Sequence, residues 1–147
     1  MSEKRAFKKL KEALSNGKVE RRLDRVENIV GAGWPDCNGC FSGIEFWIEV
    51  KEPTEPKRSS TKLFGSNHKL SQEQMNWIKR QILSGGLAYV YIDTGGWRLL
   101  IGGRIADSIN DMTLDRLKAE ALWLAKVPMK DKNHWEGIVD VVLNRKV

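Results

Sequence analysis

The spacing of hydrophobic and polar residues divides the chain into helical and extended segments. Apolar side chains recur three and four positions apart over residues 2–15, which predicts a helix that ends at Asn16-Gly17. Residues 44–51 alternate instead, so we expect a strand with one face in the core and with Glu49 and Lys51 on the other face. Residues 36–41 fit a preceding strand, with Ser42-Gly43 as the two-residue turn between them.

The second half of the chain contains the most complete helix signal. Ser71 is placed as an N-cap, Gln74 completes a capping box three residues later, and Gly85-Gly86 ends the helix. The other predicted elements are a weak helix or strand over 19–27, strands over 87–92 and 97–101, and a helix over 113–127. Residues 135–143 are ambiguous, although their Ile and Val content favours a strand. This order, αβββαβ plus a tail, predicts an α/β fold with a mixed central sheet flanked by helices.

Length and composition fit one domain over residues 1–147. A chain of 147 residues that is 41% hydrophobic can bury roughly 70% of its unfolded surface around a single core. We expect a core over about residues 3–101 and a C-terminal extension of helix and strand over about 104–147. No apolar run approaches the ~20 residues that cross a bilayer, and the start has no apolar secretion signal, so we expect no membrane partner and a cytoplasmic location.

Two other signals are weighed and set aside. The spacing Cys37-x-x-Cys40 is typical of zinc ligands, but residues 37 and 40 of a strand point to opposite faces, so Cys37 is expected in the core instead. Trp34, Trp47 and Trp97 could stack on unpaired bases, although packing inside the protein is the more common use of such residues.

Positive charge is concentrated in two segments. The chain has a formal net charge of +6, and residues 1–25 hold nine Lys and Arg against four acids. The Gly- and Pro-containing loop over 52–69 is also basic, and it is long for a simple connection. Such segments favour a polyanion partner, and nucleic acid is the leading candidate, with a merely solvated surface as the alternative. The residues expected to contact nucleic acid are Lys4, Lys8, Lys11, Arg25, Lys57, Arg58, Lys62 and Lys69.

The predicted hairpin brings two acids together. If Ser42-Gly43 is the turn, Phe41 pairs with Ile44, and the same register pairs Asp36 with Glu49. Directly opposed residues have Cβ atoms only about 5 Å apart, so two carboxylates there repel unless a cation lies between them. A divalent metal such as Mg²⁺ meets that need, and Lys51 on the same face can stabilise a phosphate or an attacking water. The alternative is an exposed sheet face with an ordinary Glu–Lys pair.

The motif residues resemble a known nuclease superfamily. Pro35-Asp36 followed by Glu49-Val50-Lys51 is similar to the PD-(D/E)XK signature, and the match is closer to the small VRR-NUC (virus-type replication-repair) nucleases of phages. The resemblance covers about residues 3–92 and implies a restriction-endonuclease-like αβββαβ core. It is carried by residues 25–28, 33–36, 47–51 and 70–74, by Trp77 and by Gly85-Gly86.

The resemblance also implies roles for individual residues. Asp36 and Glu49 are expected to ligate Mg²⁺, for which Mn²⁺ substitutes, with the Val50 carbonyl as a further ligand. Lys51 is expected to position the nucleophile. Gln74 matches a glutamine beside the site, although its capping box is a complete structural explanation. The family places one more acid on the first helix; the candidates are Glu3 and Glu27, with Glu20 a poorer third.

The function expected from these residues is metal-dependent hydrolysis of DNA phosphodiester bonds by an endonuclease. The resemblance points to branched, flap or nicked DNA in phage-type replication, repair or recombination, within the host cytoplasm. Two alternatives stay open: a dimeric Holliday-junction resolvase, and a nucleic-acid-binding module that keeps the fold without activity. The sequence leaves the choice between monomer and homodimer open.

Overall fold

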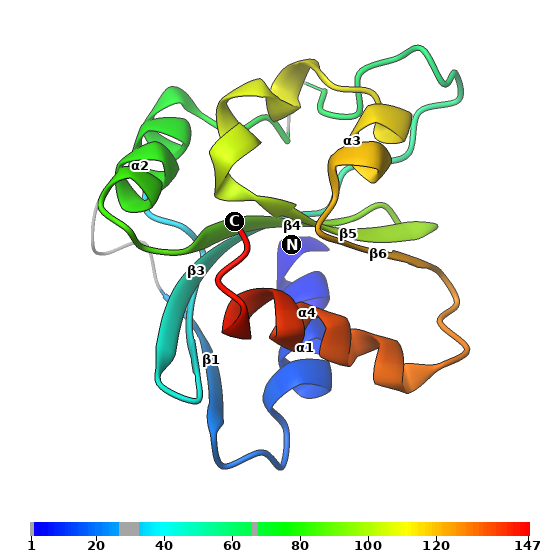
Figure 1. The fold of residues 1–147 in the computed structure, drawn as a ribbon. Helices are drawn as coiled ribbons and strands as arrows, with labels where there is room; N and C mark the ends of the chain where they lie inside the picture. The colour runs from blue at the N-terminus through cyan, green and yellow to red at the C-terminus, as the bar shows by residue number, and fades with distance from the viewer. Residues whose placement is uncertain (1, 27–32, 66–67) are drawn as a thin grey trace.

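Six strands form one mixed sheet whose spatial order follows the chain, β1-β2-β3-β4-β5-β6 (Figure 1). The computed structural model describes residues 2–26, 33–65 and 68–147, and side chains from residue 5 onward. The strands are β1 (Arg21–Arg25), β2 (Cys37–Phe41), β3 (Ile44–Lys51), β4 (Ala88–Asp93), β5 (Trp97–Gly102) and β6 (Trp123–Lys126). Neighbouring strands are antiparallel except β3 and β4, which are parallel. The predicted mixed sheet is confirmed.

Helices cover both faces of the sheet. They are α1 (Ser2–Ser15), α2 (Gln72–Leu83), α3 (Leu114–Glu120) and α4 (Glu136–Leu143), with 3-10 segments η2 (Gly103–Asp111) and η3 (Lys132–Trp135). Figure 1 shows α1 and α4 on one face, and α2, η2 and α3 on the other. Each face has its own hydrophobic cluster. The parallel β3–β4 pair requires a crossover, and this crossover carries α2.

The alternation of β3 assigns its side chains to these two clusters. Phe46, Ile48 and Val50 are fully buried in the cluster beneath α1 and α4. Trp47 packs on the opposite cluster beneath α2. Because side chains in a strand alternate between faces, Glu49 and Lys51 lie on the α2 side with Trp47.

The turn between β2 and β3 sets the register of the hairpin. Ser42 has φ of 49° and Gly43 has φ of 86°, the left-handed pair that two-residue hairpin turns require. Phe41 is therefore opposite Ile44, and the pairing continues to Cys37 opposite Ile48. The predicted turn and register are both confirmed, although the strand begins at Cys37 rather than at Asp36.

Two predicted elements of the C-terminal extension are wrong. The helix expected over 113–127 ends at Glu120, and the chain then forms β6, which pairs with β5 and extends the sheet. The strand expected over 135–143 is the helix α4. In α4, Ile138, Val139 and Val142 are buried at helical spacing against the sheet, so packing overrides the strand preference of β-branched residues.

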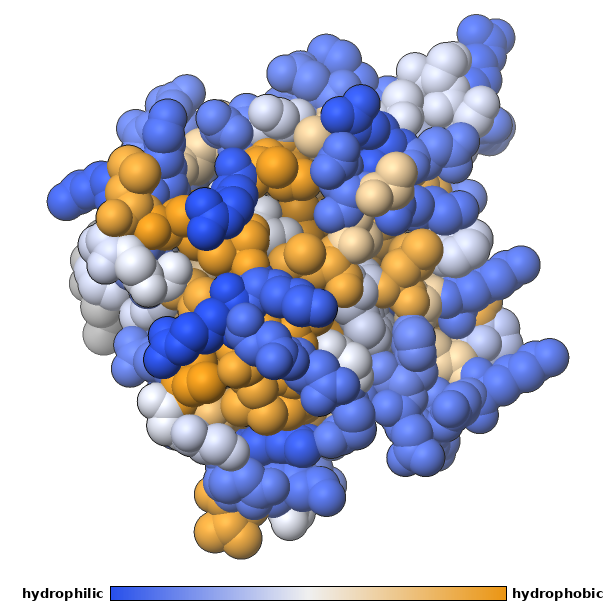
Figure 2. All heavy atoms as spheres, in the orientation of Figure 1, coloured by the Kyte–Doolittle hydropathy of each residue, from blue (hydrophilic) through white to orange (hydrophobic). Residues whose placement is uncertain are grey.

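The described surface is largely hydrophilic on the face shown in Figure 2, with hydrophobic atoms visible between the polar side chains. Within residues 2–26, 33–65 and 68–147, no helix combines the length and the hydropathy needed to cross a bilayer.

Gly39 provides a test of how tightly the β2–β3 hairpin is packed. A Cβ at this position would overlap the ring of Phe46, which is fully buried against Phe41 and Tyr89. We expect Gly39→Ala to lower the free energy of unfolding by about 1–3 kcal/mol, because the ring has no room to move. Gly65→Ala is the matched control, since a Cβ there meets no atom within 4 Å. Urea denaturation measures both; equal stability of the two variants would contradict the packing.

Candidate active site

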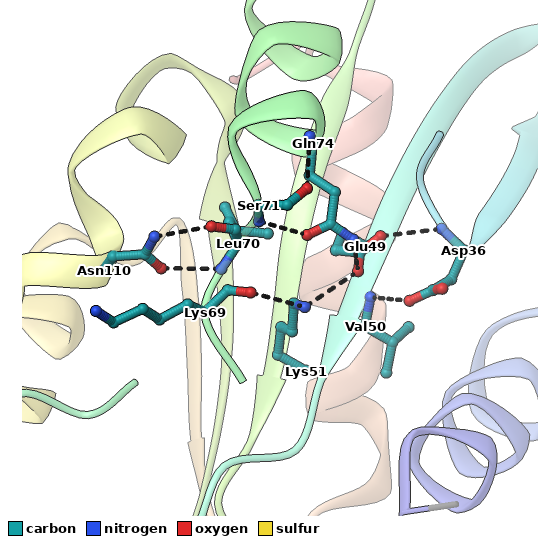
Figure 3. Close-up of polar contacts among 9 residues, drawn as sticks. All are labelled: Asp36, Glu49, Val50, Lys51, Lys69, Leu70, Ser71, Gln74 and Asn110. Carbon is teal, nitrogen blue, oxygen red and sulfur yellow. Dashed lines mark hydrogen bonds and ion pairs between the residues drawn. The ribbon is translucent and has the colours of Figure 1, made fainter. Parts of the chain in front are cut away.

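The candidate site lies where β2 separates from β3. The last β2–β3 pair is Cys37 with Ile48, so residues 49–51 pair only with β4. Asp36 occupies the gap that opens on the β2 side: its Oδ2 accepts a hydrogen bond from the Val50 N–H at 3.0 Å. Its own backbone N–H donates to Glu49 Oε1 at 3.2 Å (Figure 3). The two acids predicted to oppose each other are thus brought together.

The Val50 backbone faces the same gap. A residue in a strand directs its N–H and its C=O to the same side. Because the Val50 N–H bonds the Asp36 carboxylate, the Val50 carbonyl also opens toward Asp36. The Asp36 carboxylate and this carbonyl therefore present oxygen atoms to one small region at the edge of β3.

Glu49 is almost completely buried. Its side chain is surrounded by donors: Oε1 accepts from the Asp36 N–H, and Oε2 accepts from Gln74 Nε2 at 2.9 Å. Lys51 Nζ lies 3.5 Å from Oε2. Burial, followed by the charge of Asp36, raises the pKa of Glu49 to about 8, and Lys51 opposes this shift. Burial and Asp36 thus oppose ionisation of Glu49, and the surrounding donors favour it.

Gln74 completes the predicted capping box and also contacts Glu49. Its Oε1 accepts from the Ser71 N–H at 2.9 Å, and Ser71 Oγ accepts from the Gln74 N–H at 3.1 Å, which completes the capping box. Its Nε2 is then left to donate to Glu49. The cap holds the amide in the orientation that this second hydrogen bond needs (Figure 3).

Lys51 is enclosed between two oxygen atoms. Its Nζ donates to the Lys69 carbonyl at 3.4 Å and lies close to Glu49 Oε2. The segment that supplies this carbonyl is fixed by Asn110 of η2, which accepts from the Leu70 N–H and donates to the Leu70 carbonyl, both at 2.9 Å. Asn110 was missed in the sequence because it lies 40 residues from its partner and belongs to no local motif.

Three tryptophan rings pack against one another and join the segments that carry the site residues. The ring centroids of Trp34, Trp47 and Trp77 lie 5.2–5.4 Å from one another. Trp34 and Trp47 are each two residues before an acid of the site, and Trp77 is three residues after Gln74. The expected packing role of Trp34 and Trp47 is confirmed, and their partner Trp77 lies on α2.

Gly33 allows the segment before Asp36 to lie against α2. Its φ is 88°, and a Cβ there would lie 2.6 Å from the Glu73 carbonyl oxygen. Only glycine combines this conformation with so close an approach. The segment before Asp36 is therefore held by its backbone contact with α2 as well as by the tryptophan rings.

The sequence offered three candidates for the acid expected from the first helix, and the structure places only one of their side chains. The side chain of Glu3 and all of Glu27 lie outside the described residues. Glu20 is the wrong candidate, because its carbonyl accepts from the Ser42 N–H at the hairpin turn. Ser42 is six residues from Asp36, which is roughly 20 Å along an extended chain with a rise of about 3.3 Å per residue. Glu20 therefore lies far from the site.

The predicted basic residues do not form one cluster at the site. Arg25 pairs with Cys37, the residue after Asp36, and Lys69 adjoins Lys51 through its carbonyl. Lys11 and Lys62 pair with surface acids, Asp24 at 3.5 Å and Asp111 at 3.0 Å. The remaining basic candidates with described side chains are exposed: Lys8, Lys57 and Arg58. The side chain of Lys4 is not described.

The donor set fits a hard divalent cation. Among the described residues, no three His, Cys, Asp or Glu side chains gather around one point. Mg²⁺ needs fewer, since it is commonly held by one or two carboxylates together with water and substrate phosphate. Asp36, Glu49 and the Val50 carbonyl offer such oxygens, and a cation there would relieve the repulsion between the two acids.

Cys37, the residue set aside as a zinc ligand, is fully buried in the core, as predicted.

No protein-family model matches the chain, and no curated protein matches its sequence. The chemistry of the site is therefore inferred from its own side chains: a buried acid, a second acid beside it, an enclosed ammonium and an amide that orients the buried acid.

The raised pKa of Glu49 predicts a pH-dependent stability. Between its unfolded value of 4.5 and about 8, the folded protein binds more protons than the unfolded chain. Without divalent metal, the free energy of unfolding should therefore fall as pH rises through this range, by up to about 1 kcal/mol per pH unit. Glu49→Gln should flatten the profile, whereas Glu45→Gln, on an exposed part of the same strand, should not. Urea denaturation at pH 5 to 8 measures this, and parallel profiles for wild type and Glu49→Gln would contradict it.

The two hydrogen bonds between Asn110 and the Leu70 backbone predict that removing the Asn110 side chain lowers the stability of the protein. Asn110→Ala leaves the Leu70 N–H and carbonyl without their partner, so we expect a loss of about 1–3 kcal/mol in the free energy of unfolding. Asn76→Ala is the control, because Asn76 is exposed and bonds only the neighbouring Gln72 in the described structure. Thermal and urea unfolding compare the two, and a loss no larger than that of the control would mean that Asn110 does not hold this segment.

Proposed function

We propose that this protein is a metal-dependent DNA endonuclease of the PD-(D/E)XK type, most similar to the VRR-NUC nucleases of phages. The observation that carries the proposal is the pairing of Asp36 with the buried Glu49 at the point where β2 leaves β3, with Lys51 on the same face as Glu49. The element order α1-β1-β2-β3-α2-β4 is the order that the restriction-endonuclease-like core requires, and it supports the same proposal.

Each residue has a definite part in phosphodiester hydrolysis. Asp36, Glu49 and the Val50 carbonyl hold Mg²⁺ or Mn²⁺, which when bound polarises the scissile phosphate and lowers the pKa of a coordinated water. Lys51 directs its ammonium to the phosphate or to the attacking water and stabilises the negative charge that develops there. Gln74 donates to Glu49 Oε2 and so orients the carboxyl group, whose Oε1 accepts from the Asp36 N–H.

The basic side chains supply affinity that does not depend on base sequence. Arg25 and Lys69 lie next to the site, and the exposed Lys8, Lys57 and Arg58 contact phosphates further along the DNA. Binding of this kind weakens steeply as salt is raised. We place the activity on branched, flap or nicked DNA in the cytoplasm, in the setting of phage-type replication, repair or recombination.

Cleavage assays on linear, flap, nicked and four-way DNA test this proposal. In the presence of Mg²⁺ or Mn²⁺, Asp36→Asn and Lys51→Met should each reduce the rate by about 10²-fold or more, because each removes a charge that acts on the transition state. The controls are Asp107→Asn and Lys130→Met, which make the same chemical changes at exposed positions.

The remaining outcomes separate the alternatives. Equal cleavage by wild type and by Asp36→Asn would show that the site is misplaced. No cleavage by wild type, with salt-sensitive DNA binding retained, would identify a silent binding module. Light scattering that finds a dimer on four-way DNA, together with symmetric cutting, would identify a junction resolvase.

A further inference from the structure

Arg98 is a buried cation on the face of the sheet opposite the candidate site. Its register partner is Asp93, and both side chains lie on the α1 and α4 face, because alternation places them with Tyr91 and Leu100. Arg98 is 7% exposed, and its Nε donates to Asp93 Oδ2 at 3.4 Å. Its guanidinium carbon lies 5.1 Å from the centroid of the Trp135 ring.

Among the described residues, Arg98 uses little of its hydrogen-bonding capacity. A guanidinium has five N–H donors, and only the Nε–H of Arg98 bonds to a described residue. Neither Nη atom is sealed in the interior without a partner, since neither is among the buried unsatisfied atoms. Arg98 also lines two cavities, so these N–H donors lie beside space that a ligand or water can enter.

That space consists of two adjoining cavities that share Arg98, Lys9 and Val127. The larger, of about 520 Å³, is open to solvent and is also lined by Met129, Lys132 and Trp135. The smaller, of about 240 Å³, is bordered by Arg5, Glu52 and Asp93. The larger is of the size that small-molecule sites have in proteins.

The charges around the larger cavity favour an anion. Arg98, Lys9 and Lys132 line it together with one acid, Glu12. In the smaller cavity the acids are already engaged: Glu52 bonds Arg5 at 2.8 Å, and Asp93 bonds Arg98. Lys9 and Lys132 form no ion pair within the described part of the chain. An arginine fork flanked by two ammonium groups is the arrangement that recognises phosphate oxygens.

We propose that Arg98, Lys9 and Lys132 form a binding site for a phosphate group. The Nη atoms of Arg98 donate to two phosphate oxygens at the base of the cavity, where burial strengthens the interaction. The Trp135 ring backs the guanidinium and keeps it from turning away. Lys9 from α1 and Lys132 from η3 neutralise the remaining charge at the mouth.

The position of the site suggests where the phosphate comes from. Lys51 pairs with Ile92 of β4, and Arg98 lies one strand further and one residue beyond, so the two Cα atoms are on the order of 10 Å apart across the sheet. A nucleic-acid strand that passes around this end of the sheet reaches both faces. This assignment of the source rests on the proposed function, whereas phosphate binding itself does not; a free nucleotide is the other source.

Titration of metal-free protein with inorganic phosphate tests the site without any cleavage. We expect saturable binding by calorimetry at constant ionic strength, and at least about a tenfold weaker affinity in Lys9→Gln/Lys132→Gln, since each lost phosphate contact removes a charge-assisted hydrogen bond. Arg98→Lys, which keeps the charge but loses the fork, should weaken binding similarly. Lys79→Gln/Lys146→Gln removes the same charge at exposed positions and should bind as wild type does.

Two results would overturn the proposal. One is no binding of phosphate above a chloride control. The other is equal weakening in the Lys9/Lys132 and Lys79/Lys146 variants, which would indicate only a general charge effect. Because the Lys9 and Lys132 changes leave the buried Arg98–Asp93 pair intact, they stay informative if Arg98→Lys does not fold.

Further arms of the titration distinguish the sources. A 5′-phosphorylated oligonucleotide that binds more tightly than its unphosphorylated counterpart, with the difference lost in Lys9→Gln/Lys132→Gln, supports nucleic acid. Binding of deoxyadenosine monophosphate with no such difference supports a free nucleotide. Failure of the proposed nuclease would leave these binding results unchanged, so the two proposals fail separately.

Discussion

Asp36 and Glu49 place two carboxyl groups beside each other at a position where water is nearly excluded from one of them. Desolvation and the neighbouring acid both oppose ionisation of Glu49, so its pKa is raised, whereas Lys51 and the Asp36 N–H act against that shift. The Asp36 N–H, Gln74 Nε2 and the Lys51 ammonium all face its carboxylate oxygens. A cation beside Glu49 would lower this electrostatic cost further, and the proposed metal site depends on that effect.

The geometry of this pair depends on contacts that come from distant parts of the chain. Strand β3 fixes Glu49 and Lys51, while the crossover helix α2 delivers Gln74 to the same face. The three tryptophan rings join the segment before Asp36, β3 and α2, and Asn110 of η2 fixes the chain that leads into α2. No single element could hold the two acids against their repulsion. The fold achieves it because four segments restrain one another.

Local signals predicted the parts of the fold that local geometry determines. The Ser42-Gly43 turn gave the hairpin register, and therefore the meeting of Asp36 and Glu49, because a two-residue turn leaves only one pairing. The capping box located the start of α2 for a similar reason. The prediction failed over 123–126 and 135–143, where burial against the sheet decides between helix and strand. Asn110 and the unused donors of Arg98 could not be found from sequence, since their meaning depends on residues 40 positions away or on a cavity.

The C-terminal extension contributes to both faces of the sheet and so connects the two sites. On the α2 face, η2 supplies Asn110 and packs Ala106 and Ile109 into the same hydrophobic cluster as Ile78 of α2. On the other face, η3 supplies Trp135, whose ring lies beside the Arg98 guanidinium and shares a cluster with Leu10 of α1. A change in how the extension packs would therefore reach Lys51 through Lys69 and Leu70, and would reach Arg98 through Trp135. The two faces meet at the end of β3, β4 and β5, where Lys51 and Arg98 lie on opposite sides of the sheet.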